Sequence, residues 1–223
     1  MQAKTVSEAV ETRRTIRSFL PTPVPRDTIE RLLDKARMAP SGCNFQPWEA
    51  TVLTGEPLRA LQEKMMTAPM QQPVEYDIQP AGLTEEYADR LRGIGALMYG
   101  SVGVARDDAE GRMTLARRNI VSFGAPVLLL CHFPRFMGPP QWADVGMWLQ
   151  TVMLLAREEG LDSCPQEFMA LYARLIKDHI GVDDATHILF CGLALGYHDP
   201  DAPGNSHPRP RVPLERQIRF IGY

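Results

Sequence analysis

The chain has 223 residues, of which 44% are hydrophobic and 23% are charged, and its formal net charge is -3. These values are typical of a globular protein with a sizeable core, and the charge offers no basis for binding nucleic acid or an anionic membrane. The first residues lack the apolar core of a secretory signal, the longest apolar runs are too short to span a bilayer, and the four cysteines form no CxxC pair. We therefore expect a cytoplasmic protein that spans no membrane and keeps its cysteines reduced.

Two helices are predicted before the first strand. Thr5 and Glu8 form a T-x-x-E capping box, which predicts a helix over residues 6–13. Prolines then forbid further helix until Asp27, which is expected to cap the second one. Apolar residues in that helix recur at i, i+3, i+4 and i+7, so one face is apolar, and Pro40 ends it.

The rest of the chain alternates between helix and strand patterns. The expected strands cover residues 48–53, 126–133 and 187–195, and the expected helices cover residues 56–66, 84–104, 107–118, 142–159 and 168–179. Residues 67–83 predict an irregular excursion, which at this length is usually functional or mobile, and residues 162–166 predict a turn. The tail from Tyr197 is rich in proline and arginine, so it must lie along something else, such as another subunit. We therefore expect one α+β domain over residues 1–223.

The common catalytic and metal motifs are not found. Residues 93–98 begin like a dinucleotide fingerprint, but the third glycine is missing and no strand precedes them, which favours a helix-packing surface. The five histidines are never spaced by three or four residues, so we predict no metal site. Cys164 has no base beside it and is expected to be a buried structural thiol.

Two arginine clusters and one polar loop form the remaining candidate site. The arginines are Arg13, Arg14 and Arg17 after the first helix, and Arg209 and Arg211 in the tail. The loop at residues 39–48 offers Ser41, Gly42, Asn44 and Gln46. Solvated surface charge would explain most arginine pairs, but guanidinium groups also recognise phosphate and planar carbonyl edges. Together with the loop, they suit a ligand that has a phosphate and a flat hydrogen-bonding ring, such as flavin mononucleotide (FMN).

Four segments, in sequence order, resemble the nitroreductase family of FMN-dependent oxidoreductases. They are R-R-T-I-R-S-F at residues 13–19, A-P-S-G-C-N-F-Q-P-W at 39–48, G-L-D-S-C-P at 160–165, and G-L-A-L-G-Y at 192–197 with the later R-P-R at 209–211. The resemblance spans nearly the full length, and the tail at residues 196–205 is most similar to the bacterial nitrobenzene and nitrobenzoate reductases.

The resemblance implies a fold and an assembly. In the family, a central mixed or antiparallel sheet is flanked by helices, and two subunits interlock as a homodimer. Each of two FMN sites is built from both chains. For this chain, residues 67–104 would then form a lid over the substrate, and residues 197–223 an extended tail that spans the subunits.

The resemblance also assigns the cofactor contacts in four groups. Arg13, Arg14, Arg209 and Arg211 would hold the phosphate and ribityl end, and Thr15 and Arg17 would reach the pyrimidine side of the ring. Pro40, Ser41, Gly42 and Asn44 would come from the neighbouring subunit. Ser163, Cys164, Pro165 and Gln166 would border the ring at N5, with Glu167 next in the chain.

The implied activity is reduction of nitroaromatic compounds or quinones by ping-pong hydride transfer, with NADH or NADPH as the electron donor. The flavin would carry the chemistry and Arg17 would supply electrostatic support, without a catalytic side chain. Two alternatives remain open: another flavoenzyme of the same fold (an ene-reductase, a reductive dehalogenase or a flavin-consuming enzyme) and a flavin-binding protein without turnover. Residues 67–104 do not match the Glu/Tyr/Lys clamp of iodotyrosine dehalogenases, which disfavours dehalogenation.

Overall fold

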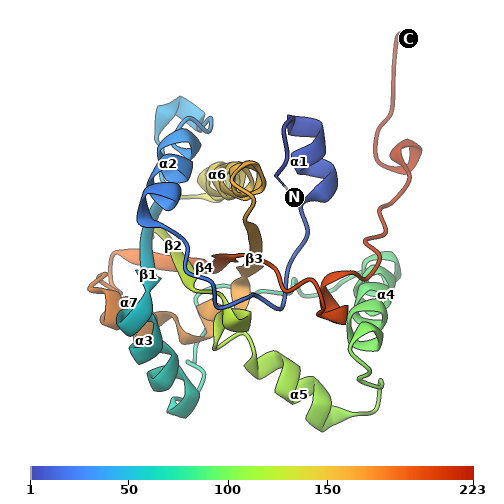
Figure 1. Cartoon of the computed structure of the whole chain (residues 1–223). Helices are drawn as coiled ribbons and strands as arrows, with labels where there is room; N and C mark the ends of the chain where they lie inside the picture. Colours follow the sequence, from blue (N-terminus) through green and yellow to red (C-terminus); the bar gives the residue numbers. More distant parts are fainter. Residues whose placement is uncertain (1) are drawn as a thin grey trace.

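A four-stranded antiparallel sheet forms the centre of the computed structural model, which describes residues 2–223 (Figure 1). The strands are β1 (Glu49–Thr54), β2 (Val127–Pro134), β3 (Asp162–Gln166) and β4 (His187–Gly196). Their order is β1-β2-β4-β3, so β1 and β3 form the two edges. The expected α+β class is confirmed.

Helices cover both faces of this sheet and extend to one side of it (Figure 1). The α-helices are α1 (Val6–Thr12), α2 (Arg26–Ala36), α3 (Gly55–Thr67), α4 (Glu85–Ser101), α5 (Ala109–Arg117), α6 (Pro139–Glu158) and α7 (Ala173–Ile180). Short 3-10 helices are η1 (Gly42–Asn44), η2 (Ser122–Gly124), η3 (Glu167–Tyr172), η4 (Pro203–Asn205) and η5 (Leu214–Arg216).

Both faces of strand β2, which lies inside the sheet, are covered by helices. Leu129 and Cys131 belong to the core cluster that contains residues of α2 and α6. Leu128 and Leu130 belong to a second cluster, with residues of α3, η3 and α7. Because successive side chains of a strand point to opposite faces, burial on both sides explains why the sequence of β2 is continuously apolar.

The predicted capping box of the first helix is confirmed. The Thr5 hydroxyl accepts a hydrogen bond from the Glu8 backbone N–H at 3.1 Å, and the Glu8 carboxylate accepts one from the Thr5 N–H at 3.3 Å. Helix α1 begins at this capping box and ends at Thr12, one residue before the expected end.

The prediction that Asp27 caps the second helix is wrong. Helix α2 begins at Arg26, with Pro25 in the N-cap position. Asp27 lies within the first turn, where its carboxylate accepts from the N–H of Thr28 at 2.9 Å and pairs with Arg31 at 2.7 Å. Its negative charge therefore acts on the helix dipole and on the next turn instead of capping the helix.

Residues 162–166 form strand β3 instead of the expected turn. They pair antiparallel with β4, from Asp162 opposite Gly196 to Gln166 opposite Gly192. Pro165 removes one N–H, which an edge strand tolerates because only one of its sides faces a neighbour. The Asp-Ser-Cys-Pro composition favours a turn locally, and pairing with β4 overrides that preference.

Two helix boundaries also differ from expectation. The single helix expected at residues 168–179 is divided into η3 and α7, and the left-handed Gly181 (φ 71°) follows α7. Helix α6 begins at Pro139 instead of residue 142. Proline at the first helical position costs no hydrogen bond, so the helix can begin there.

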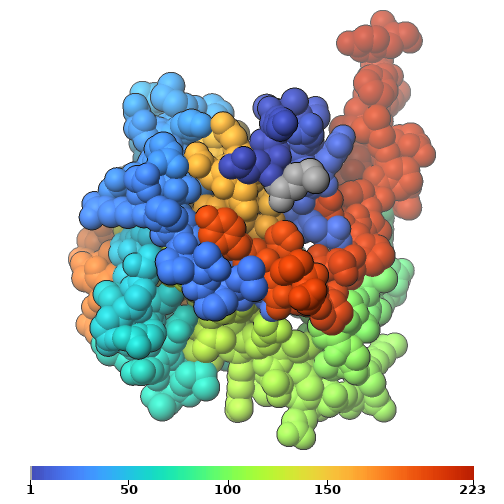
Figure 2. Space-filling model, in the orientation of Figure 1, coloured from blue at the N-terminus to red at the C-terminus, as the bar shows by residue number. Residues whose placement is uncertain are grey.

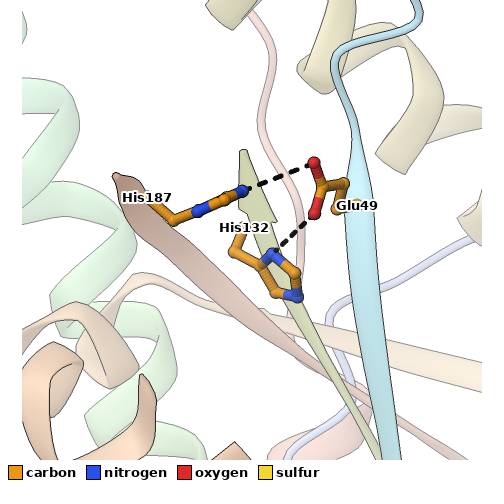
Figure 3. A group of neighbouring side chains, drawn as sticks. All are labelled: Glu49, His132 and His187. Atoms are coloured by element: carbon orange, nitrogen blue, oxygen red, sulfur yellow. Dashed lines mark hydrogen bonds and ion pairs between the residues drawn. The ribbon is translucent and has the colours of Figure 1, made fainter. Parts of the chain in front are cut away.

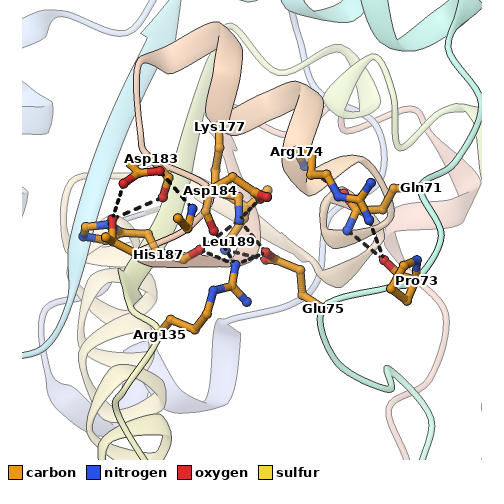
Figure 4. A network of polar contacts seen from close by, with 12 residues as sticks. Gln71, Pro73, Glu75, Arg135, Arg174, Lys177, Asp183, Asp184, His187 and Leu189 are labelled. Atoms are coloured by element: carbon orange, nitrogen blue, oxygen red, sulfur yellow. Dashed lines mark hydrogen bonds and ion pairs between the residues drawn. The ribbon is translucent and has the colours of Figure 1, made fainter.

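The irregular segment at residues 67–83 is anchored to the body near its middle (Figure 4). The Glu75 carboxylate contacts the buried Lys177 ammonium group, pairs with Arg135 at 2.8 Å and accepts from a β4 backbone N–H at 2.8 Å. The next residue, Tyr76, packs its ring edge-on against Trp142, with centroids 5.2 Å apart. The excursion is therefore tied to the core at these two residues.

Helices α4 and α5 bury none of their residues, although α4 carries the large apolar side chains of Tyr87, Leu91 and Ile94. They lie beside the sheet, and the last part of the tail projects away from the body (Figures 1 and 2). Ile218, Phe220 and other apolar tail residues are exposed. Within the described residues, no helix is long and apolar enough to cross a bilayer.

Candidate active site

The arginine-rich segment after α1 lies between β3 and the C-terminal tail. Arg13 has an extended backbone (φ −56°, ψ 126°), which ends α1 and turns the chain toward β3. The N–H of Ile16 then donates to the Ser163 carbonyl at 3.0 Å. On the other side, the N–H of Leu20 donates to the Tyr197 carbonyl at 2.8 Å. These contacts bring the first and last motifs of the sequence together.

Asn205 connects the tail to the same segment. Its side-chain oxygen accepts from the Arg17 N–H at 2.9 Å, and its amide group donates to the carbonyls of Ser18 at 2.9 Å and Asp199 at 3.0 Å. The residue is buried, so these bonds are made away from water. The tail beyond Asn205 is thereby held against the arginine segment.

The two arginine clusters meet around one cavity of about 150 Å³. Its lining residues are Arg13, Arg14, Thr15, Arg17, Ile94, His207, Arg209 and Arg211. None of these lining residues is acidic. The Arg14 guanidinium donates to the His207 carbonyl and the Arg209 guanidinium to the carbonyls of Glu11 and Arg13, so backbone oxygens orient the cations without neutralising them.

The pKa values of two of these arginines are lowered, first by burial and then by neighbouring positive charge. Burial and the nearby charge of Arg211 lower the pKa of Arg13. Burial and the charges of Arg14, Arg13 and Arg211 lower the pKa of Arg209. An anion placed among these guanidinium groups would relieve this repulsion and accept charge-assisted hydrogen bonds. The donor set therefore suits a phosphate group.

A second cavity of about 200 Å³ adjoins the first and shares Arg17 with it. Its walls are mostly apolar and come from α4, α5, η2 and the tail, including Tyr99, Leu115 and Phe123. A cavity with apolar walls beside a cationic one fits a ligand that has a ring and an anionic end.

Strand β3 borders this region with two unpaired polar atoms. The hydroxyl oxygen of Ser163 and the side-chain oxygen of Gln166 are buried and have no hydrogen-bond partner in the described part of the chain. The amide nitrogen of Gln166 donates to the Asn119 carbonyl at 2.9 Å. A buried polar atom without a partner is costly, so these two oxygens indicate that something polar completes the site.

The side chain of Cys164 is buried in an apolar cluster with Ile16, Phe123 and Ala194, and it lines neither cavity. Burial raises the pKa of the thiol to about 12. The expected burial of this thiol is confirmed, and a cofactor contact at this position stays a prediction. Pro165, the next residue, is exposed.

The loop of Pro40, Ser41, Gly42 and Asn44 lies elsewhere, between α2 and β1, and lines neither cavity. The N–H of Gly42 donates to both carboxylate oxygens of Asp144 in α6, each at 3.2 Å. The Ser41 hydroxyl accepts a hydrogen bond from the Gln46 N–H at 3.0 Å. One of its hydrogen bonds is therefore made within the loop itself.

This loop is also strained and exposed. Cys43 (φ 51°), Asn44 (φ 57°) and Gln46 (φ 47°) adopt left-handed backbone conformations, which cost energy for residues other than glycine. Residues 42–46 are all exposed. Such strain is typical of a functional loop, and a contribution of this loop to the site of a second chain stays a prediction.

Sequence reasoning missed four residues around the site: Ile94, Asn119, His207 and Asn205. They lie far apart in sequence or in irregular segments, and no spacing identifies them. Asn205 follows the Pro-Gly pair of the tail, which indicates a turn but not its partner.

Comparison with known proteins places this geometry in a family. A sequence model of the Nitroreductase family matches residues 10–197. A 4-nitrobenzoate reductase from Pseudomonas putida is 40% identical over 217 residues, which cover 96% of this chain and 94% of that protein.

Solved structures agree over nearly the whole chain. The FMN and NADPH-dependent nitroreductase NfnB from Sphigopyxis sp. strain HMH has a TM-score of 0.92 at 46% identity, covering 98% of this chain and 100% of that one. The FMN-dependent nitroreductase NfnB from Mycobacterium smegmatis, in complex with NADPH, has a TM-score of 0.91 at 28% identity, covering 96% and 97%. The expected fold is confirmed.

Proposed function

Because the chain belongs to the nitroreductase family, we propose that it is an FMN-dependent NAD(P)H oxidoreductase that reduces nitroaromatic compounds or quinones. The observation that carries this proposal is the cavity lined by five arginines and no carboxylate, beside a cavity with apolar walls. These two environments suit the phosphate and the ring of one flavin mononucleotide.

The residues of the arginine cavity would bind the cofactor. Arg13, Arg14, Arg209 and Arg211 would hold the phosphate and ribityl end, where their geometry allows several charge-assisted hydrogen bonds. Thr15 and Arg17 would contact the pyrimidine side of the ring. Pro40, Ser41, Gly42 and Asn44 of a second chain would complete the site, together with the β3 segment Ser163, Cys164, Pro165 and Gln166.

Bound FMN would supply hydride and electron transfer between NAD(P)H and the acceptor. The protein provides position and charge. Arg17 lines both cavities and would supply positive charge to the reduced form of the bound ring. The walls of the second cavity, which are mostly apolar, would hold the ring. The Cys164 thiol, with a pKa raised to about 12, stays protonated and takes no part as a nucleophile.

We further propose an interlocked homodimer. Several surfaces of the single chain support it: the apolar residues exposed on the projecting tail, the exposed loop at 42–46, and α4 without a buried residue. The outer edge of β1 has no strand beside it among the described residues. A second copy of the chain would cover these surfaces and would hold the tail at residues 197–223.

The organisation within the chain is part of the same proposal. Residues 1–223 form one FMN-binding domain, with residues 67–104 as the lid over the substrate. Glu75 and Tyr76 anchor the first part of that lid, whereas α4 has no fully buried residue. The four cysteines are free thiols, including Cys131 and Cys191 on paired strands, which supports a reducing compartment such as the cytoplasm.

Purified protein tests the proposal directly. It is expected to be yellow, with flavin absorbance, and to oxidise NADH or NADPH with ping-pong kinetics when a nitrobenzoate or a quinone is added. Activated alkenes and halophenols test the other flavoenzyme activities in the same assay. A colourless protein that does not bind added FMN would overturn the proposal, and bound FMN without turnover of any acceptor would identify a flavin-binding protein instead.

A further inference from the structure

Three metal-ligating side chains converge at the end of the sheet opposite the arginine cavity. Glu49 of β1, His132 of β2 and His187 of β4 point toward one another from three neighbouring strands (Figure 3). His187 is the first residue of β4, whereas the arginine segment lies beside Ser163, which pairs with Leu195 near the other end of that strand. The cluster is therefore separate from the proposed flavin site.

The spacing of the cluster is too wide for strong hydrogen bonds and close to that of metal ligands. Glu49 Oε1 lies 3.4 Å from His187 Nε2, and Glu49 Oε2 lies 3.6 Å from His132 Nδ1. All the ligand atoms lie within 4.8 Å of one another. Neighbouring ligands at about 2.0–2.1 Å from a tetrahedral zinc ion are about 3.3 Å apart. Small side-chain adjustments would close the cluster around one ion.

His132 supplies an independent indication of a ligand. The residue is 5% exposed, and its Nδ1 atom is buried without a hydrogen-bond partner among the described residues. This atom faces the Glu49 carboxylate (Figure 3). A buried imidazole nitrogen without a partner is costly, and coordination of a metal ion would satisfy it.

The far nitrogen of each imidazole is held by a threonine. The hydroxyl of Thr51 lies 3.3 Å from His132 Nε2, and the hydroxyl of Thr186 lies 2.9 Å from His187 Nδ1. The Thr186 hydroxyl also donates to a carboxylate oxygen of Asp183 at 3.2 Å, so it is left to accept the proton of His187 Nδ1. This arrangement directs the lone pair of His187 Nε2 into the cluster, as outer-shell partners do in metal sites.

The backbone of His187 is fixed as well (Figure 4). Its carbonyl accepts from Lys177 at 2.8 Å and from Arg135 at 2.8 Å. The carboxylates of Glu75 and Asp184 balance these two cations: Lys177 contacts both, and Arg135 pairs with Glu75 at 2.8 Å. The charge of Glu49 is thus left to face the two imidazoles.

We propose that Glu49, His132 and His187 bind one divalent first-row metal ion of the zinc class. Two imidazoles and one carboxylate are the ligands that such ions prefer, and three protein ligands leave one coordination position open. Glu49 and His187 border a surface cavity of about 680 Å³, from which water would fill that position. The bound ion would tie β1, β2 and β4 together at this end of the sheet.

The test uses the full-length, FMN-loaded protein after treatment with a chelator. Zn²⁺ is titrated by calorimetry, and the expected result is one ion per chain and a rise in thermal unfolding temperature. The variants Glu49→Gln and His187→Gln are expected to weaken binding by about tenfold or more and to lose the thermal shift. His179→Gln is the matched control, because His179 lies on α7 with Lys64 and the Pro57 carbonyl as its polar contacts.

Co²⁺ supplies a spectroscopic test, since a tetrahedral N/O site gives visible absorption bands beyond the flavin bands. Thr186→Val keeps all three ligands and is expected to weaken binding by about tenfold. Retained FMN absorbance shows that each variant is folded and keeps this test separate from that of the proposed function. Wild-type protein that binds no Zn²⁺ stoichiometrically, or ligand variants that bind it as tightly as His179→Gln does, would overturn the proposal.

Discussion

At the scale of the residue, Arg13 combines a structural and a binding role. Its backbone ends α1, its carbonyl accepts from Arg209, and its guanidinium lines the cationic cavity. Because burial and Arg211 lower its pKa, the fold maintains an unfavourable concentration of positive charge there. Energy stored in this way is recovered when an anion binds.

Arg13→Ala is therefore expected to loosen FMN by about 1.5–3 kcal/mol, the size of a charge-assisted contact, or roughly 10- to 150-fold in Kd. Fluorescence titration of the apoprotein with FMN measures it. Arg26→Ala is the control, because Arg26 pairs with Glu30 on the exposed side of α2. Equal affinity in the two variants would contradict a phosphate role for Arg13.

A second residue with a specific role is Glu75, which takes part in a network of buried ion pairs. Its carboxylate faces Lys177, whose side chain is fully buried, and Arg135. Removal of one member of a buried ion pair leaves an uncompensated charge. Glu75→Gln is expected to lower the free energy of unfolding by about 3 kcal/mol, measured by denaturant titration. The same change at exposed Glu63 should have little effect, and comparable losses at both positions would argue against the anchor.

At the scale of the element, the buried side chain of Asn205 is one of the anchors that hold the tail at the site. Two hydrogen bonds of this side chain join the tail to Arg17 and Ser18, and a third joins it to the Asp199 carbonyl within the tail. Arg209 adds its own hydrogen bonds to the carbonyls of Glu11 and Arg13, whereas Arg211 donates to the carbonyls of Arg209 and Pro210 within the tail. Asn205, which does not line the cavity, thus supports the position of Arg209 and Arg211 together with these bonds.

Asn205→Ala is expected to release the tail and weaken FMN binding by about tenfold, because about 1.4 kcal/mol of cofactor contact would be lost with the displaced arginines. Limited proteolysis would show faster cleavage after residue 205, in parallel with the FMN titration. Ser206→Ala, at the exposed neighbouring position, is the control. Unchanged proteolysis of Asn205→Ala would show that the bonds of His207 and Arg209 to the arginine segment hold the tail without Asn205.

At the scale of the whole molecule, the single chain leaves surfaces that need a partner. The projecting end of the tail exposes Ile218, Phe220 and Ile221 at 49%, 64% and 75%. Large apolar side chains exposed along an extended segment indicate a surface that packs on something else. The strained loop at residues 42–46 stands exposed on the body in the same way.

Deletion of residues 212–223 keeps Arg209 and Arg211, which line the cavity, and removes this segment. The deletion is expected to shift the protein from dimer toward monomer and to lower its FMN content, because the proposed site takes residues from both chains. Light scattering after gel filtration measures the shift. Deletion of residues 222–223 alone should leave the dimer intact, and a stable dimer after the longer deletion would remove the tail from the interface.

Local features were predictable from the sequence because their causes lie within a few residues. The Thr5–Glu8 capping box forms within one turn of the chain. The burial of β2 could be predicted because its residues form a continuous apolar run. The motif order likewise identified the family, and the arginine segments were recognised as candidates before their positions were known.

Only the tertiary structure decided which distant segments meet. It made residues 162–166 a strand, because β4 supplied hydrogen bonds that outweigh the local preference for a turn. It placed Arg209 against Arg13 and His132 against His187, pairs whose spacing in the chain indicates nothing about their separation in space. Hydrogen bonds within a turn are encoded locally, whereas pairing between remote strands depends on how the whole core packs, and so it is settled only when the chain folds.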